Sequence, residues 1–141
     1  MTKDFNDVTT DLQNPPQCNK AQIGNVSEQT KKLILETYPD LKPLRFASKD
    51  QATVFGAMLA AAKEMPRWRL THQDQAQGTL EGVATTAMMR FKDDFVFVCK
   101  QDSAGNTIVH GRSKSRLGTS DWGANAKRIL QYFKLVEAHL Q

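Results

Sequence analysis

Residues 95–113 read FVFVCKQDSAGNTIVHGRS, and this stretch decides the fold. Residues 95–99 form a short, almost wholly apolar segment that is typical of a buried strand. Residues 103–106, Ser-Ala-Gly-Asn, are typical of a hairpin loop, and residues 107–113 form a second strand pattern. Because a short loop joins antiparallel neighbours, the stretch predicts a hairpin and an antiparallel sheet.

Two further strands are predicted on the N-terminal side of this hairpin. Residues 67–72 alternate between Trp68, Leu70 and His72 on one face and more polar side chains on the other. Gln77-Gly78 marks a turn, and residues 79–89 are rich in Thr, Val and Met. Lys92-Asp93-Asp94 then predicts an interruption before the apolar strand.

Two main helices are predicted to flank the strands. Ser48 with Gln51 fits a capping box, and Pro66 ends the helix that follows. The second helix is expected to start near Ser120 or Asp121, either of which can cap it. The apolar stripe of the first helix is Val54, Phe55, Met58, Leu59 and Ala62, and that of the second is Trp122, Ala126, Ile129, Phe133, Val136 and Leu140.

The expected fold class is therefore α+β, with a four-stranded antiparallel sheet and two main helices in the order helix-β-β-β-β-helix. A short additional helix is predicted between Ser27, its cap, and Pro39. Residues 1–26 are predicted to form an irregular arm, and residues 27–141 a single domain, since 141 residues suit one domain. Both main helices should cover apolar sheet surface, most simply on the same face.

Composition is typical of a small soluble protein. No run of apolar residues is long enough to cross a membrane, and the polar first twenty residues contain no signal peptide in the chain as given. Two cysteines make neither a disulfide framework nor a zinc site, and we do not expect Cys18 to pair with Cys99, a predicted core residue. The net charge of +4 permits an anionic partner but does not require nucleic acid.

The most informative segment is residues 112–128, where five basic side chains accompany one acid, Asp121. A last strand here gives way to a last helix, and the start of a helix attracts anions. Strand alternation puts Arg112, Lys114 and Arg116 on one side and the intervening serines on the other. The candidate ligand-binding residues are Arg112, Ser113, Ser115, Arg116, Ser120, Asp121, Asn125 and Arg128.

These residues carry a resemblance to the domain-of-unknown-function 1499 family, whose pattern is Arg-Ser-x-Ser-Arg-x-Gly-x-Ser-Asp-x-Gly-x-Asn-x-x-Arg. The matching residues are Arg112, Ser113, Ser115, Arg116, Gly118, Ser120, Asp121, Gly123, Asn125 and Arg128. Phe91-Lys92-Asp93-Asp94 resembles a second family element, and the likeness covers about residues 14–135. The resemblance implies a fold and a site without an activity. It also implies an envelope, periplasmic or secreted setting, because members often carry an export signal or lipid anchor.

One departure concerns the family's Pro-Asn-Cys-Val-Ser pattern near residues 24–27. Asn25 stands where the resemblance implies a second cysteine, so a paired-cysteine role for Cys18 lacks its partner here.

Several functions stay open at this stage. The first hypothesis is binding of a small anion through Arg112, Arg116 and Arg128. The first alternative is a structural or protein-interaction module in which the same residues form a fold-stabilising network. A second alternative is a hydrolase using Ser120 or Ser115, although no Gly-x-Ser-x-Gly elbow is present, and we expect no enzyme. We expect no cofactor, no metal and no nucleic-acid partner.

Overall fold

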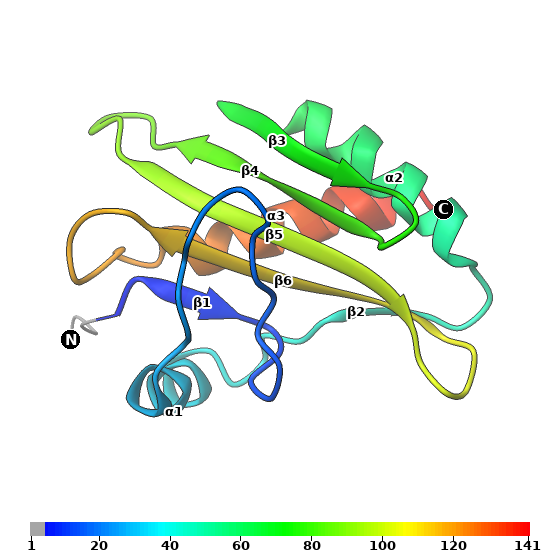
Figure 1. The fold of residues 1–141 in the computed structure, drawn as a ribbon, viewed down its shortest axis with the longest axis horizontal. Helices are drawn as coiled ribbons and strands as arrows, with labels where there is room; N and C mark the ends of the chain where they lie inside the picture. The colour runs from blue at the N-terminus through cyan, green and yellow to red at the C-terminus, as the bar shows by residue number, and fades with distance from the viewer. Residues whose placement is uncertain (1–4) are drawn as a thin grey trace.

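The computed structural model describes residues 5–141, and within them the chain forms an antiparallel sheet of six strands and three helices (Figure 1). The strands are β1 (Asp7–Thr9), β2 (Leu44–Phe46), β3 (Trp68–Asp74), β4 (Thr79–Thr85), β5 (Lys92–Gln101) and β6 (Thr107–Ser115). The helices are α1 (Glu28–Thr37), α2 (Gln51–Glu64) and α3 (Ala124–Ala138). The sheet order is β1-β6-β5-β4-β3, and β2 pairs with the other end of β6.

The α+β class and the antiparallel sheet are confirmed, and the predicted hairpin is β5–β6. The number of strands is wrong, because β1 and β2 each add three residues to the free side of β6. Strands this short show too little alternation to be recognised in the sequence. Residues 7–9 therefore belong to the sheet and not to an irregular arm.

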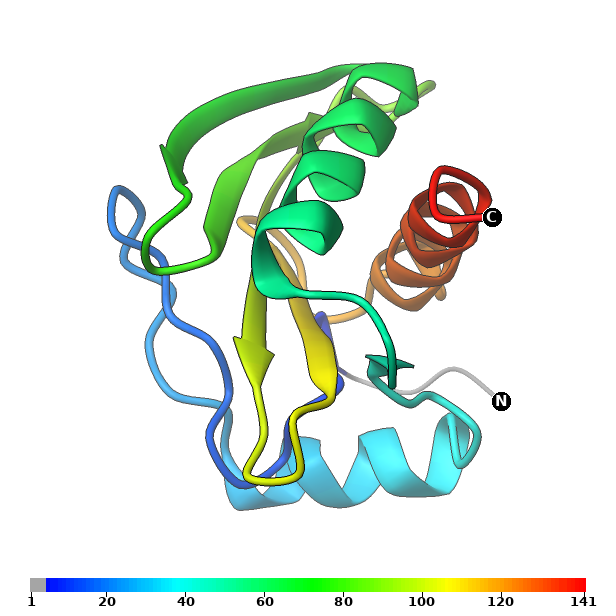
Figure 2. The same cartoon turned by 90° about the vertical axis from the view of Figure 1, so that its right-hand side faces the viewer.

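The sheet has one layer on each face (Figure 2). Helices α2 and α3 lie side by side on one face, as predicted, and the N-terminal segment that follows β1 crosses the other face. The polar run Lys92-Asp93-Asp94 does not interrupt the sheet but opens β5, where both carboxylates are buried. Each of them has a basic partner, and these pairs belong to the candidate site.

Aromatic side chains join the sheet to α3. The Trp68 ring stacks on Phe95 with centroids 3.8 Å apart, and Phe97 lies 4.3 Å from Tyr132 of α3. A Cβ atom at Gly111 would lie 2.5 Å from the Phe97 ring, so only glycine admits the ring here. Phe95, Phe97 and Tyr132 are fully buried, which makes the helix-covered face the core of the molecule.

The helix ends differ from the predicted ones in two cases. Asp50, and not Ser48, caps α2 by accepting a hydrogen bond from the Thr53 backbone. Helix α3 starts at Ala124, later than predicted, because Trp122 and Gly123 both adopt left-handed backbone angles that interrupt a helix. Trp122 is consequently 82% exposed and is not part of the apolar stripe.

The remaining helix predictions agree with the structure. Ser27 caps α1, which ends before Pro39, and Ile34 is its buried residue. No helix within residues 5–141 combines the length and apolarity needed to cross a membrane. Both cysteines are free thiols.

Candidate functional site

Strand β6 distributes the motif between the two faces of the sheet. Its register with β5 places Arg112 opposite Val96 and Ser113 opposite Phe95. Arg112 and Lys114 therefore point toward the N-terminal segment, whereas Ser113 and Ser115 point toward α3. This is the alternation that the sequence predicted.

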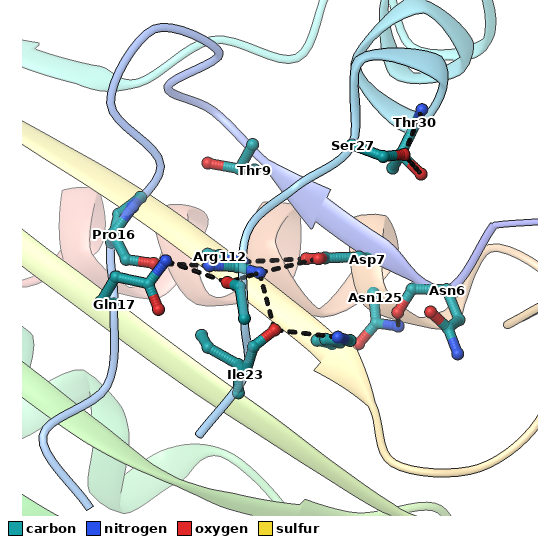
Figure 3. Close-up of polar contacts among 12 residues, drawn as sticks. Asn6, Asp7, Thr9, Pro16, Gln17, Ile23, Ser27, Thr30, Arg112 and Asn125 are labelled. Carbon is teal, nitrogen blue, oxygen red and sulfur yellow. Dashed lines mark hydrogen bonds and ion pairs between the residues drawn. The ribbon is translucent and has the colours of Figure 1, made fainter. Parts of the chain in front are cut away.

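Arg112 is fully buried and is held entirely by the protein (Figure 3). Its guanidinium forms a two-pronged ion pair with Asp7 of β1, at 2.9 and 2.8 Å. It also donates to the carbonyls of Pro16, Ile23 and Gly24 at 2.9 to 3.1 Å. The side chain thus fixes the N-terminal segment to the sheet and has no exposed surface to offer a ligand.

Arg116 lies on the same side as Arg112 but at the end of the sheet. Its guanidinium makes a two-pronged pair with the buried carboxylate of Asp94, at 3.0 and 2.9 Å. These hydrogen bonds raise the pKa of Arg116 above its ordinary value. The Arg116 side chain remains 47% exposed, so its outer edge faces solvent.

A second polar network lies on the opposite face, beneath the start of α3. The Asn125 amide accepts from Ser113 at 2.6 Å and donates to Ser115 at 2.9 Å. It also donates to Asp121 and to the Asn6 backbone. Asn125 is fully buried, and its hydrogen bonds fix the position of α3 on β6.

Arg128 extends this second network toward solvent. One terminal nitrogen of its guanidinium contacts Ser113 and Asn125 at 3.0 and 2.9 Å. The other lies 2.9 Å from the Asp93 carboxylate, an ion pair that lacks the angle of a hydrogen bond. Only 10% of the Arg128 side chain is exposed, and that part borders a hollow in the surface.

The structure does not bring the three motif arginines to one spot. Arg112 and Arg116 lie on the face that the N-terminal segment covers, and Arg128 lies on the helix face. One anion therefore cannot contact Arg112, Arg116 and Arg128 together, because α3 packs on the side of β6 that presents Ser113 and Ser115. Ser113, Ser115, Asp121 and Asn125 do come together with Arg128, as internal hydrogen-bond partners.

Two adjoining hollows open beside the start of α3. We call the first the basic hollow; its volume is about 290 Å³, and its polar lining includes Arg67, Thr85, Lys127 and Arg128. We call the second the loop hollow, of about 530 Å³, which lies between the β4–β5 and β6–α3 loops. Thr86 and Ala124 line both hollows. Ser120 lines the loop hollow and does not reach the basic one.

Sequence reasoning missed Arg67 and did not select Lys127. Arg67 lies 45 or more residues before the motif and enters the hollow only because β3 and β4 pair beside α3. Its Nε donates to the Thr85 carbonyl at 2.9 Å. Arg67 also has a left-handed backbone, with φ of 58°, which is uncommon for a residue other than glycine. Arg67 lies in the turn before β3, and no pattern in the neighbouring sequence predicts that its side chain reaches the hollow.

Within the described residues, no histidine lies near the motif serines. Ser115 accepts a hydrogen bond from Asn125, and Ser120 borders the loop hollow. The histidines lie elsewhere: His110 contacts Thr10 on the opposite face, and His139 contacts Glu64 at the far end of α3. His72 lies in β3 opposite Glu81. A nucleophilic serine needs a base within hydrogen-bond reach, and no imidazole among residues 5–141 supplies one here.

Residues 5–141 contain no cluster of His, Cys, Asp and Glu side chains that could bind a metal ion. Cys18 lies beside the buried Glu81 carboxylate, which accepts backbone hydrogen bonds from Asn19 and Lys20. Burial and, to a smaller extent, this charge raise the pKa of Cys18 to about 12. The thiol is therefore protonated at neutral pH and is a poor nucleophile.

The family model described as "Protein of unknown function (DUF1499)" matches residues 7–136. The chain belongs to this family. The match covers β1 to α3 and therefore both polar networks, so the resemblance predicted from residues 112–128 is confirmed. Among curated proteins, a search finds no match to the chain. Membership supplies no activity, and the geometry of the site has to support any proposal.

Proposed function

We propose that the protein binds a small anion, such as phosphate or a carboxylate, in the basic hollow beside the start of α3. The observation that carries this proposal is the set of three cations, Arg67, Lys127 and Arg128, around a hollow whose described lining includes no acid. Positive charge in a concave site favours an anionic guest. The proposal keeps Arg128 from the predicted motif and replaces Arg112 and Arg116 with Arg67 and Lys127.

Arg128 is well placed to serve as the fixed element of such a site. Ser113, Asn125 and Asp93 hold its guanidinium from behind, so the side chain loses little further freedom when a ligand binds. Asp93 neutralises part of its charge, so binding needs additional cations. Arg67, in the turn before β3, and Lys127, on α3, are exposed and supply them.

The size of the hollow suits a small guest. A volume of about 290 Å³ lies just below the range that is typical of ligand pockets, about 300–1,000 Å³. Arg67 uses its Nε for the Thr85 carbonyl, and its terminal nitrogens make no other bond to residues 5–141. Those nitrogens present the two-pronged geometry that carboxylates and phosphates accept.

The test is a titration of the protein with phosphate, sulfate and acetate, followed by calorimetry and by amide chemical shifts. We expect one saturable site, with shifts centred on residues 65–67 and 124–128. Arg67→Gln and Lys127→Gln should each weaken binding by at least about tenfold, because a hydrogen bond to a charged group contributes about 1.5–3 kcal/mol. Arg128 is not substituted, because it also holds the fold.

Arg69→Gln is the matched control, since Arg69 is an exposed arginine two residues further along the chain, in β3, and does not line the hollow. The proposal fails if Arg69→Gln weakens binding as much as Arg67→Gln does. It also fails if none of the three anions shifts the named amides.

A scaffold role is the second candidate for the rest of the motif. Its support is the burial of Arg112 and Asn125, whose polar atoms are engaged with the protein itself. Stability measurements on variants of Arg112 test it independently of any ligand.

A further inference from the structure

The exposed apolar side chains of this protein gather at one end of the sheet. Seven large apolar side chains in residues 5–141 are exposed, and five of them belong to two loops. Met88, Met89 and Phe91 lie in the β4–β5 loop, and Leu117 and Trp122 lie in the β6–α3 loop. Both loops extend from the same end of the sheet, on the left of Figure 1. The loop hollow, lined by Phe91, Leu117 and Trp122, joins them into one surface.

Most of these side chains protrude into solvent and are largely uncovered by neighbouring residues. Met88 is 91% exposed, Trp122 is 82% exposed, and Met89 and Leu117 are each 67% exposed. Arg90 and Trp122 hold left-handed backbone angles, with φ of 58° and 55°. Such angles are unfavourable for bulky residues, yet here they present side chains to solvent.

Positive charge surrounds the apolar tips. Residues 86–92 contain Arg90 and Lys92 and no acid, and residues 116–123 contain Arg116 and one acid, Asp121. The Asp121 carboxylate is turned inward, where it accepts from the Gly123 backbone and the Asn125 amide. The Asp94 carboxylate pairs with Arg116, so the free positive charge at this end of the sheet comes from Arg90 and Lys92. These two cations accompany the apolar tips.

We propose that these two loops dock on an anionic lipid bilayer, with their apolar tips in the interfacial region and their cations at the headgroups. Charge complementarity favours a lipid surface, because basic residues near a membrane are attracted to anionic headgroups. Tryptophan and other amphipathic or apolar side chains enter the interface readily. A fluid surface also suits separate protruding tips, whereas a stable protein interface needs a broad complementary surface of about 800 Å² on each partner.

The test is sedimentation with vesicles of phosphatidylcholine alone or mixed in equal parts with phosphatidylglycerol. We expect the protein to bind the mixed vesicles more strongly, and added salt to weaken that preference. Tryptophan emission should shift to shorter wavelength on binding, and the shift should be lost in Trp122→Asn, which replaces the exposed indole. Asparagine tolerates the left-handed backbone at this position.

The double variant Met88→Ser/Met89→Ser should reduce vesicle partitioning by at least about tenfold, because burying one such side chain contributes about 1.5–3 kcal/mol. Leu35→Ser is the matched control, since Leu35 is 58% exposed on α1, outside both loops. Equal loss in Leu35→Ser, or no preference for the anionic vesicles, would overturn the proposal. Self-association that depends on Met88 and Met89 without vesicle binding would overturn it too, in favour of a protein interface.

The residues that test the membrane proposal differ from those that test the basic hollow. Arg67→Gln tests the hollow and leaves both loop tips intact, and Met88→Ser/Met89→Ser does the reverse. Failure of one proposal therefore leaves the other standing.

Discussion

Replacing Arg112 with methionine should cost more stability than any surface charge substitution in this protein. The change removes the ion pair with Asp7 and the donors to the carbonyls of Pro16, Ile23 and Gly24. Asp7 would remain as an unpaired carboxylate with a side chain only 8% exposed. Removing one partner of a buried pair typically costs about 3–5 kcal/mol, and we expect Arg112→Met to fall in that range.

Urea unfolding followed by circular dichroism measures the loss, with protease sensitivity as a second readout. Arg112 holds three carbonyls of the N-terminal segment, so residues 16–24 should become cleavable before the sheet unfolds. Arg112→Met/Asp7→Leu should recover a large part of the stability, because it removes both charges together.

Arg45→Met is the control for this prediction. The Arg45–Asp102 pair has the same 2.9 Å contact, but the Arg45 side chain is 57% exposed and solvent screens the pair. The reasoning would be refuted if Arg112→Met destabilised the protein no more than Arg45→Met, or left the N-terminal segment as resistant to protease as before.

Two further predictions concern β6, and a third concerns α2. Burial lowers the pKa of His110 despite the nearby Asp11 carboxylate, so the unfolded chain takes up the proton first as the pH falls. Stability should therefore decline as the pH drops through about 6.5, and His110→Asn should remove that part of the decline in urea titrations. Gly111→Ala should destabilise the fold by about 1–3 kcal/mol, because its Cβ would meet the Phe97 ring at 2.5 Å. Thermal unfolding should show the opposite sign for Gly56→Ala, which adds a methyl group in open space inside α2.

Long elements with a clear period were predictable from the sequence. The β5–β6 hairpin and the apolar face of α2 each repeat their pattern over several residues. Strands β1 and β2 were not predictable, since three residues contain no repeated pattern and their pairing depends on the free side of β6. Asp93 and Asp94 suggested a turn because two adjacent acids are rare within a strand. Their basic partners, Arg128 and Arg116, come from other elements.

The candidate site was predictable in its location and not in its composition. Residues 112–128 do mark the place where the sheet, α3 and two hollows meet. Local sequence shows which residues carry charge, but it does not show which charges the fold has already neutralised. Arg112 and Arg67 illustrate the difference: the motif residue is fully buried, and the accessible one lies far from the motif in sequence.

The alternation of β6 explains why one short motif is so rich in polar residues. Arg112 and Lys114 bind the carbonyls of the N-terminal segment on one face, and Ser113 and Ser115 bind Asn125 of α3 on the other. A single strand thereby holds both outer layers, and each polar atom must find a partner because burial without one is costly. The atoms that meet this requirement are already engaged within the protein. In the anion site proposed above, the additional contacts therefore come from Arg67 and Lys127, which line the basic hollow beside Arg128.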